Sequence, residues 1–274
     1  MKNVCVITGG GSGMGLATAK ILGKDNDIII VGRTAKKLEN AIAELNSEGI
    51  EAEAFACDIS DRASVDKLAA HAKELGTITS VIHAAGMSPH MGDGRKIMEV
   101  NAFGTINMNE AFYEVMEKGS CLIDISSMSA YLTPEIIMPQ RKYKYSRINK
   151  GLFMKKMMAR VNIFPKKLRS SIAYSISKHF VIWYAKTDAA KFGQKEIRII
   201  SITPGTFETP MAELEKNEAD VFIKHCAIKR PGRVEEIANL IAFCAGNKAG
   251  YLTGTDIICD GGCVASGVNP LALK

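Results

Sequence analysis

The feature that most constrains the fold of this chain is a regular alternation between two kinds of segment. Apolar runs of strand length, beginning with NVCVIT at 3–8 and DIIIVG at 27–32, are each followed by an amphipathic segment of helix length. Repeated strand–helix–strand units place parallel strands in one sheet, because each crossover helix must pack back on that sheet. The pattern predicts an α/β fold with a Rossmann-type doubly wound parallel sheet of about seven strands and helices on both faces.

The alternation continues to the end of the chain. No repeat of fixed period and no low-complexity linker divides the 274 residues, so we expect a single domain covering 1–274. Apolar runs predict the strands and helical spacing of apolar residues predicts the helices. The predicted strands are 3–8, 27–32, 51–57, 80–86, 120–126, 196–202 and 255–262, and the predicted helices are 14–22, 35–45, 64–75, 96–117, one containing Tyr174, and 234–245.

A basic insertion at about 128–170 interrupts this alternation, between a predicted strand and the helix that should follow it closely. Its residues 141–169 include eleven Lys and Arg and no acid. Four interpretations stay open: a charged excursion packed on the body or on another subunit, a substrate lid with a cationic rim for an amphipathic anion, a membrane-surface element, and a nucleic-acid-binding element. A basic amphipathic helix is predicted from one apolar stripe, formed by Ile148, Leu152, Met157, Met158 and Val161.

Composition narrows the class of protein. Hydrophobic residues make up 47% of the chain and charged residues 23%, which is typical of a folded globular protein and excludes a disordered one. The seven cysteines, none in a CxxC pair, indicate reduced core residues, and the chain enters a strand without room for a signal peptide. With no apolar run of about 18 residues, we expect no transmembrane segment and a cytoplasmic location. No metal site or nucleic-acid partner is expected.

A glycine-rich turn, TGGGSGMG at 8–15, connects the first predicted strand to the first predicted helix. Glycine without a Cβ lets backbone amides approach a pyrophosphate, and the helix N-terminus adds unpaired N–H groups and a positive dipole end. The turn predicts a dinucleotide phosphate site, although a glycine-rich turn without a ligand would read the same.

The end of the second predicted strand bears on cofactor choice. An acid here would bind the adenosine 2′-hydroxyl, but the sequence IIIVGRT offers Gly32 and Arg33 instead. Because a guanidinium binds a phosphate through bidentate charge-assisted bonds, the sequence favours NADP(H), with NAD(H) still possible. The alternative is an arginine that points to solvent. After the third strand, Asp58 is either an acceptor for the adenine amino group or the N-cap of the next helix.

Tyr174 and Lys178 are spaced i and i+4 on a predicted helix and so share a face. A lysine ammonium close to a phenol favours the phenolate and lowers its pKa from about 10 toward the working range of a general acid or base. The alternative is an ordinary surface pair.

Taken together, these motifs resemble those of the short-chain dehydrogenase/reductase family. The resemblance covers nearly the whole chain except the insertion. Its C-terminal part consists of RPGR at 230–233 and YLTGTDIICDGG at 251–262. The other motifs are TGGGSGMG, HAAG at 83–86, Asn101 in EVNAFGT, ISS at 125–127, YSISK at 174–178 and TPGTFETPM at 203–211.

The resemblance implies a role for each of four catalytic residues. Tyr174 would exchange a proton with the substrate oxygen, Lys178 would depress the tyrosine pKa and hold the nicotinamide ribose, and Asn101 would position a water. Ser127 would hydrogen-bond the substrate oxygen, with Ser126 and Ser129 as rivals. The implied cofactor-binding residues are Thr8, Gly9, Gly11, Ser12, Gly13, Met14, Gly15, Arg33, Asp58, Ile59, Ala84, Ala85, Gly86, Tyr174, Lys178, Pro204, Gly205 and Thr209.

The activity implied is an NADP(H)-dependent interconversion of a secondary alcohol and a ketone by a homo-oligomer. A hydroxysteroid or bile acid is the leading substrate, because some family members with a comparable insertion act on hydroxysteroids. Two alternatives are a 3-ketoacyl-thioester reductase and a noncatalytic nucleotide-sensing or interaction protein. His83 stands where the family usually has asparagine, and we expect it to be a hydrogen-bonded structural residue. The family's mobile substrate loop would correspond to 207–224.

Overall fold

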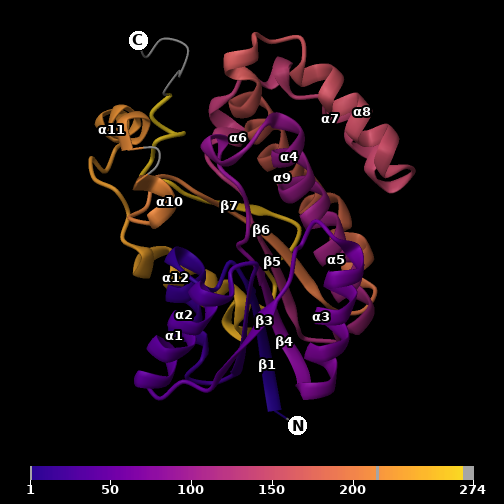
Figure 1. Ribbon diagram of the computed structural model, residues 1–274, viewed down its shortest axis with the longest axis vertical. Coiled ribbons are helices and arrows are strands. Elements are labelled where there is room, and N and C mark those ends of the chain that lie inside the picture. The colour runs from indigo at the N-terminus through magenta and orange to yellow at the C-terminus, as the bar shows by residue number, and fades with distance from the viewer. Residues whose placement is uncertain (1, 214–215, 268–274) are drawn as a thin grey trace.

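The structure is a computed structural model that describes residues 2–213 and 216–267. One parallel sheet of seven strands runs through its centre in the order β3-β2-β1-β4-β5-β6-β7 (Figure 1). The order reverses direction between β1 and β4, so the prediction of a doubly wound sheet is confirmed. The strands are β1 (Lys2–Thr8), β2 (Asp27–Gly32), β3 (Ala52–Ala56), β4 (Gly76–His83), β5 (Cys121–Ile125), β6 (Arg198–Pro204) and β7 (Asp256–Cys259).

Helices cover both faces of this sheet (Figure 1). Side chains alternate along β1, where Cys5 and Ile7 belong to one apolar core and Val4 and Val6 to the other. The central strands are therefore buried on both sides, as parallel strands usually are. The first core is covered by α1 (Gly13–Leu22), α2 (Ala35–Ser47) and α12 (Val234–Ala245), and the second by α3 (Arg62–Leu75), α5 (Gly104–Val115) and α9 (Arg169–Gly193).

The helix predicted at 96–117 consists of three pieces. A short α4 (Gly94–Met98) is followed by a π-helical turn (Glu99–Phe103) and then by α5. Asn101 lies in the π-helical turn, a kind of helix distortion that often occurs at functional sites. The fourth strand also differs from its prediction at 80–86, because β4 begins directly after α3 and ends before Ala84.

Between β5 and α9 the insertion folds into short helices that end in a longer one. The helix predicted there is present. The prediction that Ile148 belongs to its buried apolar face is wrong, because Ile148 is 71% exposed. The reason is local: the Asn149 side chain accepts a hydrogen bond from Leu152 N and caps the helix, so Ile148 lies outside it. The helices are α6 (Ser129–Leu132), α7 (Gln140–Tyr143) and α8 (Lys150–Val161), with 3₁₀ turns at Glu135–Ile137, Lys144–Arg147 and Lys166–Leu168; the buried face of α8 is Phe153, Met154, Met157 and Val161.

An aromatic cluster attaches the insertion to α9. Tyr143 is fully buried and meets the edges of Phe180 and Trp183, and the ring of Phe153 lies 4.8 Å from that of Phe180. Aromatic contacts of this kind add to the free energy gained from buried area. The insertion is thus part of the second core.

Several of the basic side chains also bind the insertion to the body. Arg147 forms a 2.7 Å ion pair with Asp188 of α9 and stacks over the ring of Trp183. Lys150 donates to Asn107 Oδ1 of α5 at 2.9 Å. Arg160 donates to the carbonyl oxygen of Ile137 within the insertion itself. These contacts favour the first of the four interpretations, a charged excursion packed on the body.

We expect Phe153→Ala to lower the free energy of unfolding by about 3 kcal/mol, because it empties a fully buried aromatic site. Urea denaturation followed by circular dichroism measures the change. The control is Ile148→Ala, which removes an exposed apolar side chain of the same insertion and should change stability by about 0.5 kcal/mol at most. Equal effects of the two substitutions would show that the insertion does not pack as described.

Candidate active site

Two adjoining pockets lie at the carboxyl ends of the strands. One is formed around the turn from β1 to α1 and the end of β2, and the other around the ends of β5 and β6 and the middle of α9. The two pockets share a wall, because both are lined by Met14, Ala84, Gly86, Thr209 and Met211. An elongated ligand can therefore extend from one into the other, at the edge of the sheet where α/β proteins usually bind ligands.

The glycine-rich turn requires glycine for steric reasons. Gly9 has a φ of +71°, and a Cβ on it would lie 3.0 Å from the backbone nitrogen of Ala85. At Gly15 a Cβ would lie 2.4 Å from the carbonyl oxygen of Gly9. The turn brings the start of α1 to the first pocket, and its glycines let the backbone come close to a ligand, which is the geometry that suits a pyrophosphate.

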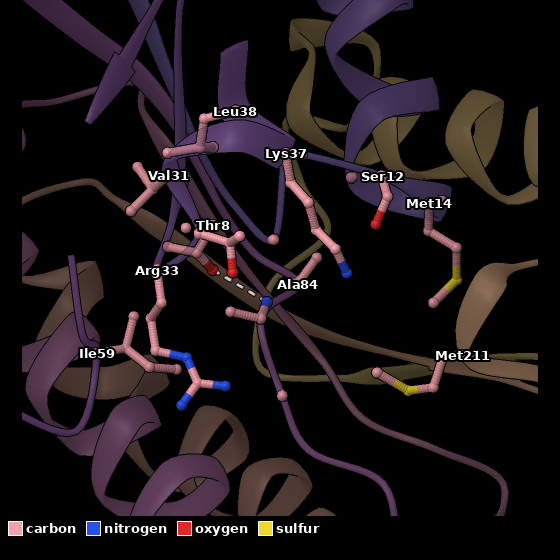
Figure 2. A pocket seen from close by; sticks show the side chains of 18 of the residues that line it. Thr8, Ser12, Met14, Val31, Arg33, Lys37, Leu38, Ile59, Ala84 and Met211 are labelled. Carbon is pink, nitrogen blue, oxygen red and sulfur yellow. Dashed lines mark hydrogen bonds between the residues drawn. The ribbon is translucent and has the colours of Figure 1, made fainter. Parts of the chain in front are cut away.

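Two cations lie in the first pocket. Figure 2 shows the Arg33 guanidinium and the Lys37 ammonium both directed into it, Arg33 from the turn after β2 and Lys37 from the first turn of α2. None of the described residues that line this pocket is acidic. Sequence reasoning missed Lys37, although its spacing of four residues from Arg33 offered a signal for a second cation at the same ligand.

Asp58 is not among the described residues lining either pocket. Its Oδ1 accepts hydrogen bonds from the backbone nitrogen and the hydroxyl of Ser60, at 2.9 and 2.6 Å. The alternative role as an N-cap is wrong, because Asp61 caps α3 by accepting from Ala63 N. The other predicted cofactor residues line the first pocket, the second or both: Thr8, Gly9, Gly11, Ser12, Gly13, Met14, Gly15, Arg33, Ile59, Ala84, Ala85, Gly86, Tyr174, Lys178, Pro204, Gly205 and Thr209.

Lys178 and Tyr174 line the second pocket from α9. Lys178 is buried, and its Nζ donates to the carbonyl oxygen of Ile125 at 2.9 Å. Burial lowers the pKa of Lys178 to about 8, because an ammonium is poorly solvated there, while Asp124 raises it. The Lys178 Nζ lies 5.9 Å from the centre of the Tyr174 ring, so the cation and the phenol share one end of the pocket.

The three serines after β5 differ in their contacts. Ser126 Oγ donates to the carbonyl oxygen of Lys178 at 2.8 Å, which commits its proton to the helix backbone. Ser127 Oγ accepts from the backbone nitrogen of Ser129 at 3.3 Å, and its own proton remains available to the pocket that it lines. Ser129 also lines the pocket, and its Oγ has no hydrogen-bond partner among the described residues. These contacts disfavour Ser126 as the donor to the substrate oxygen, and they leave Ser129 as an alternative to Ser127 in that role.

Asn101 is hydrogen-bonded at both ends of its amide. Its Oδ1 accepts from Met87 N at 2.8 Å, and its Nδ2 donates to Met87 O and to Ser177 Oγ. It is absent from the residues described as lining the pockets, but a Cβ on Gly86 would lie 3.2 Å from its Oδ1 and 3.3 Å from Lys178 Nζ. Its observed contacts hold the loop after β4 against α9, and the water-positioning role stays a prediction.

His83 forms a buried hydrogen bond between its Nδ1 and the Thr8 hydroxyl at 2.9 Å. Burial and the nearby Lys178 ammonium lower the pKa of His83 to about 3, so the ring is neutral at physiological pH. Thr8 Oγ1 in turn accepts from Ala85 N at 3.1 Å, the bond drawn in Figure 2. His83 therefore helps to hold the loop that borders both pockets, as expected for a structural residue.

The second pocket is otherwise apolar and hydroxyl-lined. Among its described lining residues, Lys178 carries the only formal charge. Helices α10 (Pro210–Glu213) and α11 (Lys216–His225) contribute Met211 and Phe222 from the segment expected to hold the substrate loop. None of the basic residues at 141–169 lines the pocket, so the interpretation of this stretch as a lid with a cationic rim is not supported.

Two features are absent from the described residues. No helix in 2–213 or 216–267 is long and apolar enough to cross a membrane. In the same part of the chain, no group of three or more His, Cys, Asp or Glu side chains is arranged to hold a metal ion.

Known proteins resemble this chain over most of its length. Residues 3–139 match a family model described as short chain dehydrogenase, and 157–264 match one described as enoyl-(acyl carrier protein) reductase. The short-chain dehydrogenase/reductase bsc3 of Alternaria brassicicola is 27% identical over 269 residues, with 96% of each chain covered. A 3-oxoacyl-(acyl-carrier-protein) reductase of Thermotoga maritima is 24% identical over 273 residues, covering 95% of this chain and 97% of the relative.

The fold is similar to that of solved structures. The crystal structure of a short chain dehydrogenase from Burkholderia cenocepacia in complex with NADP gives a TM-score of 0.76 at 22% identity, covering 94% of this chain and 96% of that one. The two matched family models leave out 140–156, which lies inside the basic insertion.

Proposed function

Because the chain belongs to the short-chain dehydrogenase/reductase family, it is an oxidoreductase that acts on CH–OH groups, and we propose that it interconverts a secondary alcohol and a ketone with NADP(H). The observation that carries the proposal is the wall that the two pockets share. It joins the glycine-rich turn to the pocket that contains Tyr174, Lys178 and Ser127. When bound, the nicotinamide supplies or accepts the hydride.

In this proposal the chain's own residues move the proton. Tyr174 gives its phenolic proton to the carbonyl oxygen during reduction, and Ser127 donates a hydrogen bond to the same oxygen. The Lys178 ammonium stabilises the phenolate that forms and holds the ribose hydroxyls. Its bond to Ile125 O fixes the ammonium in place before the reaction begins, so little reorganisation is needed.

Arg33 and Lys37 support NADP(H) over NAD(H). Both cations line the first pocket without an acid beside them, a charge distribution that suits a 2′-phosphate better than a 2′-hydroxyl. The similar structure from Burkholderia cenocepacia, which contains NADP, adds support at the level of the fold.

For the substrate we propose a ketone or alcohol with an uncharged apolar body, with an oxo- or hydroxysteroid as the leading candidate. The pocket offers methionine, leucine and phenylalanine side chains and a single charge. A bile acid fits only if its carboxylate stays outside. The second candidate is a 3-ketoacyl thioester, which the Thermotoga maritima relative favours.

The test follows oxidation of NADPH, with NADH in parallel, over oxo-steroids, oxo-bile acids, 3-ketoacyl thioesters and simple diketones. Preferred reduction of uncharged oxo-steroids would support the leading substrate, and preferred reduction of ketoacyl thioesters would replace it with the second. If NADPH binds but no ketone is reduced, the noncatalytic nucleotide-sensing alternative takes the place of this proposal.

We expect Ser127→Ala to lower kcat about 100-fold, the usual cost of losing one hydrogen-bond donor to the reacting oxygen. Ser129→Ala, the matched control on the same pocket wall, should change kcat less than about threefold by the same reasoning. Steady-state kinetics with saturating NADPH measures both. The reverse order of effects would assign the substrate hydrogen bond to Ser129.

Assembly and location form a separate part of the proposal. We propose a homo-oligomer that acts in the cytoplasm, where its seven free thiols stay reduced. An apolar edge of the sheet supports assembly, since β7 is the last strand and its Ile258 is exposed, as is Phe243 on α12. Light scattering after size-exclusion chromatography measures the oligomeric state.

A further inference from the structure

A carboxyl group is buried beside the proposed catalytic lysine. Asp124 lies on β5, is fully buried, and precedes Ile125, whose carbonyl oxygen accepts from Lys178 Nζ. Its Oδ2 accepts a 2.8 Å hydrogen bond from Asn109 Nδ2 of α5. Among the described residues no ion pair is formed with Asp124. An ionised carboxylate in this position would be costly, because a single amide replaces its water shell.

Asp124 and Asn109 each have one buried side-chain oxygen without a hydrogen-bond partner in the described part of the chain. These oxygens are Asp124 Oδ1 and Asn109 Oδ1. Buried polar atoms nearly always have one, so the coincidence on two bonded side chains requires an explanation. If Asp124 is ionised, neither oxygen can serve the other, since both only accept.

A proton on Asp124 Oδ1 supplies the missing donor. A neutral carboxyl group has one O–H donor, and a primary amide has a carbonyl acceptor beside its N–H. The acid would accept from Asn109 Nδ2 on one oxygen and donate to Asn109 Oδ1 from the other, so that two parallel hydrogen bonds join two planar groups. The existing 2.8 Å bond is already one of these.

The surroundings of Asp124 agree with a neutral form. Burial, together with the Asp188 carboxylate of α9, raises the pKa of Asp124 to about 7, while Asn109 and the Lys178 ammonium oppose the shift. Asp188 is itself paired with Arg147 of the insertion. On β4, the neighbouring strand, His83 is opposite Asp124 in register and is neutral, because burial holds its pKa at about 3.

We propose that Asp124 is a positioning residue that is paired with Asn109 as a neutral acid and sets the charge around Lys178. Ionisation of Asp124 at higher pH stabilises the Lys178 ammonium through space, and the ammonium in turn stabilises the Tyr174 phenolate. Asp124 touches neither pocket among their described linings and so acts only through Lys178. The effect on turnover rests on the function proposed above, whereas the protonation of Asp124 does not.

The first experiment tests the protonation without any catalysis. A carboxyl group whose folded pKa exceeds its unfolded value of about 4 stabilises the protein below that value and loses the contribution as pH rises through the folded pKa. Asp124→Asn keeps a donor facing Asn109 and does not titrate. From pH 5 to pH 8 the folding equilibrium constant of the wild type should therefore fall roughly 80-fold relative to that of Asp124→Asn, because the pKa of Asp124 is about 7 in the folded state and about 4 in the unfolded state.

A wild-type measurement covers the case in which the variant does not fold. Carbon-13 NMR of aspartate-labelled protein should show one carboxyl signal that titrates with a midpoint near 7, the value to which burial raises the pKa of Asp124. A wild-type stability profile parallel to that of Asp124→Asn, or no carboxyl midpoint above 5, would overturn the proposal.

The second experiment tests the influence on Lys178. In the wild type, Asp124 ionises as pH rises and holds the ammonium; in Asp124→Asn this support is missing, so the lysine loses its proton at lower pH. The alkaline limb of kcat/KM for ketone reduction should move down by about one pH unit, with little change at pH 6. A uniform loss of activity at every pH would indicate a merely structural role and overturn the positioning role. If no ketone is reduced at all, the proposed function fails, and the stability and NMR results still decide the protonation.

Discussion

Tyr174→Phe is expected to lower kcat for ketone reduction about 1000-fold or more, because the variant has no proton to give to the carbonyl oxygen. Binding of NADPH should be unchanged, since the phenyl ring of Tyr174 occupies the same space and the cations of the first pocket are untouched. Oxidation of NADPH at saturating ketone measures the first quantity, and fluorescence titration of NADPH measures the second.

The control is Tyr251→Phe, which removes the hydroxyl of a fully exposed tyrosine and should leave kcat unchanged. Because Tyr174 and Ser127 are proposed to act on one oxygen, the double variant should lose far less than the product of the two single losses. Wild-type turnover in Tyr174→Phe would refute the acid/base role. If the loss of kcat in the double variant equals the product of the two single losses, Ser127 and Tyr174 act independently.

The sheet was predictable from the sequence because its central strands contain short apolar runs buried on both faces. Runs such as DIIIVG leave no polar side for solvent, which selects a parallel sheet covered by helices. The ends of the strands could not be predicted from the apolar pattern in the same way. Nothing in the apolar pattern of HAAG shows that β4 stops at His83, whose side chain is held by a hydrogen bond to Thr8 on the neighbouring strand.

The insertion was harder to predict because its partners are distant in the sequence. Which face of α8 is buried depends on Phe180 and Trp183 of α9, and the cap at Asn149 decides that Ile148 is left outside. A charge run without acids reads as a solvated face. In the fold, however, Arg147 forms an ion pair with Asp188, which is distant in the sequence.

Asp124 illustrates another limit of sequence reasoning. In CLIDI an aspartate within a strand indicates an exposed position or a strand end, and the alternation of side chains alone does not show that α5 covers it with Asn109. The protonation of a buried acid depends on which groups surround it in space. Such a residue is therefore found only after the layers are assembled.

Replacing both cations of the first pocket, in Arg33→Ala with Lys37→Ala, is expected to lower kcat/KM for NADPH about 1000-fold. Each cation would contribute a charge-assisted hydrogen bond to the 2′-phosphate, worth about 1.5–3 kcal/mol. The value of kcat/KM for NADH should change less than about threefold by the same reasoning, because a 2′-hydroxyl makes no such ion contact. The preference for NADP(H) should therefore be lost, which initial rates at varied cofactor concentration measure.

A matched control is Arg95→Ala, since Arg95 is an exposed arginine outside the first pocket as described. This substitution should leave kcat/KM unchanged for both NADPH and NADH. If the double variant loses NADPH and NADH activity equally, the two cations bind the pyrophosphate that both cofactors share. Cofactor choice would then have to come from another part of the pocket. Loss of NADPH activity alone would show that the turn after β2 and the first turn of α2 act together on the phosphate, through the two cations that they direct into the pocket.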